Sequence, residues 1–296
     1  MASSFIMPFA GSEIDDCEHQ RSQSELEAFL NSPKSRAILF EQGRPALKAS
    51  GGLKLVLPKD LVGQNIADPG PLFMGTWDGT PLFAFHIQKE NDITEIESFQ
   101  DMRVVASHLS PNELAIAGRA KSLLEWHASH TYCAKCGNQS APQRGGNSRK
   151  CISCGTDHFP RVNPVTIMLV VRGDQCLLGR GHGWPEGSYS ALAGFISPGE
   201  TIEEGCAREV KEEVGLKVEN QRYVFSQPWP FPSQLMIGLI CETQETELTI
   251  DKNEIEDAKW FSKDQVEAVF AKRSDVFKRP PRFTIAHQLL RHWLSE

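Results

Sequence analysis

The pattern of apolar and polar positions in the second half of the chain predicts a sheet flanked by helices. Continuous apolar runs rich in β-branched residues cover 165–171 and 235–241, as is typical of buried strands. Because helical segments follow and interrupt these runs, we expect a mixed sheet packed between helices, an α+β fold. Further strands are expected at 176–178, 223–226 and 258–261, and helices at 262–270 and 284–294.

Residues 202–214 carry the clearest helical pattern in the chain. Thr201 and Glu204 match a T-x-x-E capping box, which predicts that the helix begins at about Ile202. Gly215 suits the left-handed residue just beyond the helix end. The apolar positions recur every four residues and give the helix one side to bury: Ile202, Cys206, Val210 and Val214.

The first half of the chain predicts a small, mostly β domain. Short apolar runs alternate there with glycine and proline turn signals. Asp78-Gly79 lies between two of the runs and predicts a hairpin. The runs are 37–40, 53–57, 72–74 and 82–87.

A long helix is expected at the end of this domain. Ser110 begins a second capping box and Pro111 occupies the first helical position, so the helix should run to about Ser129. We interpret Trp126-His127 within it as core residues rather than a site. Residues 1–24 are polar, lack a periodic pattern and are expected to be partly loose.

Length and composition narrow the class of protein. A chain of 296 residues favours two domains, and 40% hydrophobic with 23% charged residues is ordinary for a globular protein. A membrane-spanning helix needs about 18 consecutive apolar residues, and no run in this chain is that long. The N-terminus lacks the pattern of a signal peptide. We therefore expect a cytoplasmic protein. A net charge of −7 argues against broad non-specific nucleic-acid binding.

Four of the eight cysteines are spaced as C-x2-C-x14-C-x2-C, which predicts a tetrathiolate zinc ribbon. Two disulfides are the alternative, and the paired C-x-x-C knuckles favour zinc. With four ligands present, we expect one structural Zn²⁺ per chain. Gly137 and Gly155 suit tight turns whose N–H groups face sulfur. The ligands are Cys133, Cys136, Cys151 and Cys154.

Glu209, Glu212 and Glu213 lie at i, i+3 and i+4 and therefore share one face of the predicted helix. Unpaired carboxylates repel each other unless a hard cation binds them, so this face predicts a Mg²⁺ or Mn²⁺ site. The alternative is a solvated acidic face beside Arg208 and Lys211. Spacing alone does not identify which glutamate acts as general base.

The loop before the helix contributes further candidates. We expect Glu200 and Arg208 to form an ion pair that fixes the loop to the helix. Gly194 and Gly199 fit a backbone that turns sharply close to phosphate.

Two motifs give this region a family resemblance. The pattern G-x5-E-x7-R-E-U-x-E-E-x-G-U, with U aliphatic, runs unbroken from Gly194 to Leu216 and resembles the Nudix box. Residues 226–236 read SQPWPFPSQLM. This stretch is either a polyproline partner motif or a stiff, extended wall that presents Trp229 and Phe231 for stacking. Taken with the box, it resembles the SQPWPFPxS motif of the NADH pyrophosphatase (NudC-type) subfamily of Nudix hydrolases.

The resemblance implies a Nudix fold at 159–296, a zinc ribbon at 129–158 and an N-terminal domain at 1–128. It implies catalytic metal ligation by Glu209, Glu213, Glu254 and the carbonyl of Ala193, with Glu212 completing the site or serving as base. The family usually has tyrosine where this chain has Phe159, so a hydroxyl is missing. The implied substrate contacts are Phe159, Gln227, Pro228, Trp229, Pro230, Phe231, Pro232, Ser233, Gln234, Ala286 and Arg103.

The implied activity is metal-dependent hydrolysis of NADH or NAD⁺ to nicotinamide mononucleotide and AMP, extending to removal of NAD caps from RNA 5′ ends. A homodimer is also implied, and no membrane partner is. Two alternatives remain open: hydrolysis of another nucleoside-diphosphate compound, such as ADP-ribose or a diadenosine polyphosphate, and a non-catalytic sensor of nucleotide or RNA.

Overall fold

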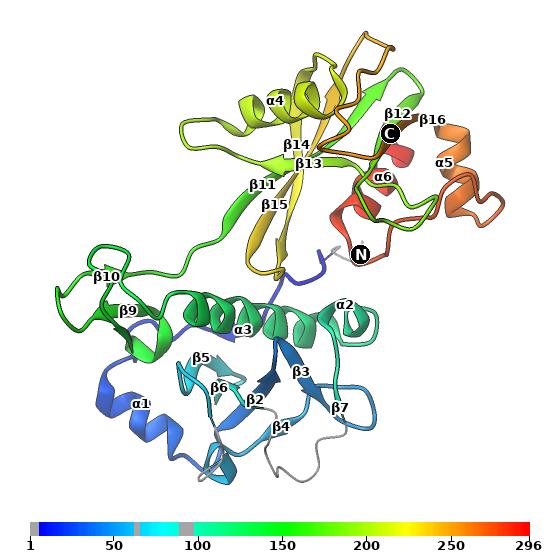
Figure 1. The fold of residues 1–296 in the computed structure, drawn as a ribbon. Coiled ribbons are helices and arrows are strands. Elements are labelled where there is room, and N and C mark those ends of the chain that lie inside the picture. Colours follow the sequence, from blue (N-terminus) through cyan, green and yellow to red (C-terminus); the bar gives the residue numbers. More distant parts are fainter. Residues whose placement is uncertain (1–5, 62–65, 89–97) are drawn as a thin grey trace. The chain divides into compact units, whose positions relative to one another are not determined.

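The computed structural model describes residues 6–61, 66–88 and 98–296, and the chain forms two compact units (Figure 1). The first unit is Met1–Val162 with Pro228–Ser233, and the second is Asn163–Gln227 with Gln234–Glu296. The chain therefore passes between the units three times. The division into three domains stays a prediction; here the cysteine ribbon groups with the first unit.

The first unit contains a mixed sheet, in agreement with the predicted β-rich domain. Asp78 and Gly79 have φ of 49° and 68°, so the predicted hairpin closes with two left-handed residues between Trp77 and Thr80. The strand order is β1-β5-β6-β2-β3-β7, with β4 paired to β2. The strands are β1 (Ile14–Asp15), β2 (Arg36–Glu41), β3 (Arg44–Leu47), β4 (Leu55–Val56), β5 (Leu72–Trp77), β6 (Thr80–His86) and β7 (Ser98–Phe99).

The α-helices among the described residues of this unit are α1 (Gln23–Leu30), α2 (Met102–Val105) and α3 (Pro111–Ser129). The long helix α3 has the predicted bounds, and the Ser110 hydroxyl caps it by accepting the Glu113 N–H. Trp126 and His127 are buried, which confirms their interpretation as core.

The expectation of a loose N-terminus is wrong for the described part of residues 1–24; residues 1–5 lie outside it. Ser22 and Glu25 form a capping box that starts α1, a signal that polar composition concealed. Arg21 is buried, and its guanidinium donates to the carbonyls of Phe73 at 3.0 Å and Arg144 at 3.3 Å. The segment is thus tied to the body of the unit.

The ribbon follows α3 as an antiparallel sheet in the order β10-β9-β8. Its strands are short, as expected for a structure held by ligands rather than by a core: β8 (Ser140–Gln143), β9 (Ser148–Cys151) and β10 (Asp157–His158).

The second unit is a mixed sheet in the order β14-β15-β11-β12-β16, with β13 paired to β11. Strand β11 is parallel to β15 and antiparallel to β12 and β13. All predicted strands are present, with longer bounds: β11 (Asn163–Arg172), β12 (Gln175–Arg180), β13 (Leu192–Phe195), β14 (Glu219–Trp229), β15 (Gln234–Glu242) and β16 (Asp257–Ser262).

Helices cover both faces of this sheet, as a mixed sheet between helices requires (Figure 1). Helix α4 (Ile202–Val214) buries Cys206, Val210 and Val214 in a core with Met168 and Leu239. On the opposite face, Gly238 lies against helix α6 (Ile285–Ser295). Helix α5 (Lys263–Phe270) begins at the predicted Ser262 cap. None of the helices in the described ranges is long and apolar enough to cross a membrane.

Candidate active site and cysteine cluster

Helix α4 begins and ends where the sequence predicted, with Thr201 accepting the Glu204 N–H and Gly215 left-handed at φ 77°. The helix carries its glutamates toward the loop that precedes it. The predicted ion pair between Arg208 and Glu200 is confirmed at 2.6 Å. This contact lowers the pKa of Glu200 to about 2.

Arg208 also corrects the expectation that the acidic face is unpaired. Its guanidinium lies 2.8 Å from a Glu209 oxygen and 2.7 Å from a Glu212 oxygen. Glu212 is half-exposed, whereas Glu209 is largely buried. Arg208 therefore neutralises part of the repulsion along the helix and holds Glu209 in a fixed orientation.

Glu213 has no such partner. The residue is only 6% exposed, and its Oε2 atom is buried without a hydrogen-bond donor among the described residues. Burial, together with the charges of Glu209 and Glu254, raises the pKa of Glu213 to about 8. A buried carboxylate oxygen left unsatisfied is costly, so its persistence indicates a ligand that the oxygen serves.

The absence of a side chain at Gly194 leaves room for the Glu209 carboxylate. The glycine lies in β13 rather than in a sharp turn, which corrects the expected reason for it. A Cβ atom added at Gly194 would lie 1.8 Å from the Glu209 carboxyl carbon, so the carboxylate rests directly on the glycine backbone. Ala193, the residue before, pairs with Ile167 of β11. Gly199 does have a left-handed backbone, at φ 95°.

Glu254 belongs to the loop before β16, which is tied to α4. The Asp251 N–H donates to the Glu213 carbonyl at 3.0 Å, and the Glu254 N–H donates to the Asp251 carbonyl at 3.1 Å. Burial raises the pKa of Glu209, as it does that of Glu213, and the charge of Glu254 adds to both shifts, so the three carboxylates share one electrostatic environment.

Two residues that hold this loop were missed by sequence reasoning. The Nε2 atom of His182 lies 2.8 Å from the carbonyl oxygen of Lys252. Arg180 lies 3.1 Å from Glu256 and accepts the Glu256 N–H on its carbonyl. Arg180 is the last residue of β12 and His182 follows it. Neither belongs to a motif, so only the folded structure relates them to Glu254.

The chemistry of these side chains fits a hard divalent cation, which prefers carboxylate oxygens. The buried, unpartnered oxygen of Glu213 is the group that most needs a cation. The roles of Glu209, Glu213, Glu254 and the Ala193 carbonyl as metal ligands stay predictions.

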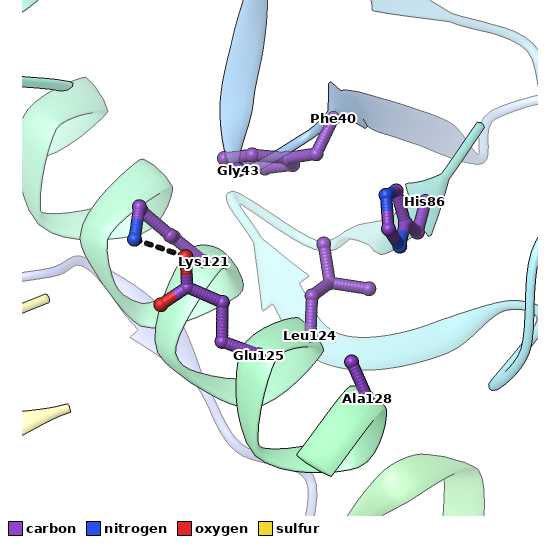
Figure 2. Close-up of a pocket in the computed structure, with 7 residues that line it drawn as sticks. All are labelled: Phe40, Gly43, His86, Lys121, Leu124, Glu125 and Ala128. Atoms are coloured by element: carbon purple, nitrogen blue, oxygen red, sulfur yellow. Dashed lines mark hydrogen bonds and ion pairs between the residues drawn. The ribbon is translucent and has the colours of Figure 1, made fainter. Parts of the chain in front are cut away.

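The Trp-Pro-Phe segment differs in part from expectation. Residues 226–229 are extended at the end of β14, as predicted, and β15 begins at Gln234. Residues 230–233 between them form a turn, so the prediction of an extended segment is wrong there. Within the first unit, Lys121 of α3 donates to the Pro230 carbonyl at 2.8 Å and forms an ion pair with Glu125 of the same helix (Figure 2). The Arg103 guanidinium carbon lies 3.9 Å from the centre of the Phe231 ring, so the structure brings these two predicted substrate contacts together.

The other predicted contacts are not all open to a ligand. Gln227 is buried, with its amide nitrogen bonded to the Phe283 carbonyl and its amide oxygen accepting the Ile285 N–H. Ala286 is buried in α6. Phe159 is 65% exposed just after β10. Pro228 and Pro232 are exposed, and Ser233 and Gln234 are half-buried. Their roles as substrate contacts stay predictions.

The four predicted zinc ligands come together. Their sulfur atoms all lie within 4.8 Å of one another, and the observed S···S separations of 3.4–3.7 Å exclude the alternative of disulfides. The N–H groups of Lys135 and Cys154 donate to sulfur, whereas Gly137 and Gly155, expected in that role, donate to carbonyls.

Side chains outside the motif support this cluster of Cys133, Cys136, Cys151 and Cys154. The His158 ring lies 3.3 Å from the Cys133 sulfur, and the Thr156 hydroxyl lies 3.2 Å from the Cys154 sulfur. The Thr156 contacts lower the pKa of Cys154 to about 6, and a thiolate is the form that binds a metal. The remaining cysteines of the second unit, Cys176, Cys206 and Cys241, are buried as expected, and Cys17 is half-buried.

Comparisons with known proteins cover both units. The chain matches the family described as "NUDIX domain" over residues 161–281 and the family described as "NADH pyrophosphatase-like rudimentary NUDIX domain" over residues 34–126. These matches leave the first 33 residues and the ribbon outside.

Three relatives give the extent of the similarity. The chain is 46% identical over 197 residues to NAD-capped RNA hydrolase NUDT12 of Homo sapiens, covering 63% of this chain but only 43% of that protein. It is 37% identical over 201 residues to NAD-capped RNA hydrolase NudC of Stutzerimonas stutzeri (strain A1501), which covers 68% of this chain and 72% of that protein. It is 35% identical over 231 residues to NAD-capped RNA hydrolase NudC of Escherichia coli O81 (strain ED1a), which covers 78% of this chain and 81% of that protein.

Proposed function

The chain belongs to the Nudix hydrolase family, and on that premise we propose that it hydrolyses the pyrophosphate of NADH or NAD⁺. Water adds to one phosphorus, the bridging P–O bond breaks, and the products are nicotinamide mononucleotide and AMP. The same pyrophosphate is present when NAD caps the 5′ end of RNA, and the relatives NUDT12 and NudC are named for that reaction. The proposal therefore includes NAD-capped RNA as a substrate.

The observation that carries this proposal is the buried, unpartnered oxygen of Glu213 beside Glu209. A purely structural acidic surface would leave its carboxylates in water, where each is fully hydrated. Here one carboxylate is buried, a second is packed on a glycine backbone, and Arg208 is placed to hold the second in position. This arrangement is expected of a site built for a divalent cation.

Each residue has a definable task in the proposed reaction. Glu209, Glu213 and Glu254, with the Ala193 carbonyl, would hold Mg²⁺ or Mn²⁺. When bound, the cation supplies neutralisation of phosphate oxygens and acidification of water. Glu212 is the remaining carboxylate on the helix and a candidate to take the proton from water. Arg208 orients Glu209, and the ion pair to Glu200 fixes the loop.

The turn at Trp229 and Phe231 is proposed to hold the planar rings of the dinucleotide by stacking. Arg103 and Phe159 are proposed to contribute to the same recognition. The four cysteines are proposed to bind one Zn²⁺ in a structural role, since a four-ligand site leaves no position for substrate. A homodimer, as the resemblance implies, is part of the proposal.

The test is hydrolysis of NADH in the presence of Mn²⁺ or Mg²⁺, with AMP and nicotinamide mononucleotide separated by chromatography. Glu213→Gln keeps the volume and removes the charge, and should lower kcat by about a hundredfold or more. Glu203→Gln is the matched control, because Glu203 is an exposed glutamate of the same helix.

Turnover of Glu213→Gln within a few-fold of the wild-type value would contradict the assignment. A panel of kcat/KM values for NADH, NAD⁺, ADP-ribose and NAD-capped RNA then ranks the substrates. Binding of NADH without any cleavage by the wild-type protein would instead support a sensor.

A further inference from the structure

We propose that Phe9, in the N-terminal segment 6–22, is a positioning residue that fixes the rings of Trp229 and Phe231 for ligand binding. This inference rests on the proposed function, because it takes those rings to stack on the planar groups of a dinucleotide. The segment lies outside both family matches, which begin at residues 34 and 161.

The three rings form one cluster within the first unit. The centre of the Phe9 ring is 5.9 Å from that of Trp229 and 6.1 Å from that of Phe231, with interplanar angles of 85° and 87°. Both pairs that Phe9 forms are edge-to-face arrangements that aromatic rings favour. The Trp229 and Phe231 ring centres are 4.8 Å apart, and their planes are tilted by 57°. Phe9 is 3% exposed, whereas the other two rings are half-buried and present surface.

The backbone at Phe9 is held in a conformation that a bulky residue seldom adopts. Its φ is 68°, in a turn closed by the Ala10 N–H donating to the Met7 carbonyl at 3.0 Å. Such a conformation persists only where surrounding contacts impose it. The packing of the Phe9 ring on Trp229 and Phe231 is one such set of contacts.

Gly118 of α3 is the residue that lets the cluster form. A Cβ atom added there would lie 3.0 Å from a Phe9 ring carbon and 3.6 Å from the Pro230 ring. A side chain at this position would displace Phe9 first, because that contact is already tighter than ordinary van der Waals contact. Glycine in a helix interior lowers helix stability, so its presence here has a packing reason.

The segment that carries Phe9 is anchored along α3 rather than resting on it loosely. The Glu13 N–H donates to the Asn112 side-chain oxygen at 2.9 Å, and the Asn112 amide donates back to the Glu13 carboxylate at 2.9 Å. Asp16 forms an ion pair with Arg119, one position after Gly118. These contacts fix the segment, and with it the Phe9 ring, against α3.

Two cations act on the same turn from other elements. Arg103 of α2 lies over the Phe231 ring at 3.9 Å, and Lys121 of α3 bonds to the Pro230 carbonyl. Without Phe9, these contacts would still hold the turn in the chain, but the tilt between Trp229 and Phe231 would no longer be fixed. We therefore expect weaker ligand binding rather than loss of the fold.

The experiment is titration of the full chain with NADH in EDTA, followed by NADH fluorescence, so that binding is measured without turnover. Phe9→Ala should raise the Kd for NADH by about fivefold to tenfold, and Phe9→Leu, which restores volume, should recover part of that loss. In the presence of Mn²⁺, KM should rise similarly while kcat stays within about twofold. Gly118→Leu, which retains Phe9 but displaces it, should weaken binding as well.

Phe29→Ala is the matched control, because Phe29 stacks on Phe73 at 5.1 Å in the same unit and is not among the ring partners of the turn. It should lower the thermal stability and leave the Kd for NADH within twofold. Wild-type Kd in Phe9→Ala, or equal weakening by Phe29→Ala, would overturn the role of Phe9 while the proposed activity stands. Wild-type protein that neither binds nor cleaves NADH would overturn both.

Discussion

The cysteine cluster of the first unit and the carboxylate cluster of the second are both sets of residues that can bind a metal. They differ in how close together their ligand atoms lie. Across the described ranges, the cysteines are the one set of three or more His, Cys, Asp or Glu side chains whose ligand atoms all lie within 4.8 Å. The ligand atoms of Glu209, Glu213 and Glu254 are not grouped this closely. Burial raises the pKa of Glu209 and of Glu213, and the charge of Glu254 adds to both shifts.

The difference follows from how each set of ligands is held in place. Short strands and turns bring the four sulfur atoms together, and the N–H groups of Lys135 and Cys154 donate to two of them. Carboxylates repel one another wherever they carry charge, and the burial of Glu213 adds to that cost. A four-thiolate site stabilises the fold, whereas a carboxylate site leaves room for water and phosphate.

The largest effect is expected at the cysteine cluster. Cys151→Ser removes a buried ligand from the ribbon, so the protein should lose its zinc and its thermal unfolding temperature should fall by about 10 °C or more. Elemental analysis after dialysis and a thermal melt measure both. Cys17→Ser, a half-buried cysteine outside the cluster, should leave about one equivalent of zinc in place. A folded, active wild-type sample without zinc would remove the zinc site.

The next effect concerns His127, a buried group that, unlike Glu213, is satisfied. One ring nitrogen lies 2.9 Å from the Gly146 carbonyl and the other 3.1 Å from Arg149. Burial lowers the pKa of His127 from 6.5 to about 4. The unfolded chain therefore takes up a proton between pH 6.5 and 4 that the folded chain does not.

The contribution of His127 to the free energy of unfolding should therefore be fully present above pH 6.5. That free energy should fall by up to about 3 kcal/mol as the pH drops toward 4. Urea unfolding at several pH values measures this loss, which should be smaller in His127→Gln than in the wild-type protein. His108→Gln, an exposed histidine, should behave like wild type. An equal pH dependence in His127→Gln and wild type would contradict the assignment.

A smaller effect is expected at the carboxylate cluster. Mn²⁺ at about a hundred times its Kd should stabilise the wild-type protein by about 2.7 kcal/mol, because the ion binds the folded state alone. Differential scanning calorimetry with and without Mn²⁺ detects this shift. Glu213→Gln should lose most of it, while Glu203→Gln should retain it. The same shift in both variants would place the ion elsewhere.

The smallest effect is expected at the loop that carries Glu254. His182→Ala removes the contact to the Lys252 carbonyl, so the Mn²⁺ concentration for half-maximal activity should rise by about tenfold with little change in kcat. His292→Ala, at the C-terminal end of α6, is the control. A change in kcat alone would show that His182 acts on something other than ion binding.

The sequence predicts the elements that depend on local chemistry. The caps of α3 and α4, the Asp78-Gly79 hairpin and the cysteine ribbon all follow from residues a few positions apart, and each is confirmed. The capping box at Ser22 was equally local and was missed because the surrounding composition is polar.

What failed depends on contacts between distant residues. The proline-rich segment predicted an extended chain throughout, but residues 230–233 form a turn that contacts α3 and lies next to Phe9. Gly194 was read as a turn residue, and its reason is the Glu209 carboxylate fifteen positions later in the chain. Neither the pairing of Arg208 with Glu209 nor the role of His182 has a spacing that would reveal it.

The six residues Pro228–Ser233 group with the first unit although the strands on both sides of them belong to the second. This has a consequence for dissection of the protein. A fragment starting at Asn163 would retain Glu209, Glu213 and Glu254, yet its aromatic turn would lack Phe9, Arg103 and Lys121. A contiguous stretch of sequence is therefore not an independent unit here: cutting the chain before Asn163 would leave the turn without the side chains that pack on it.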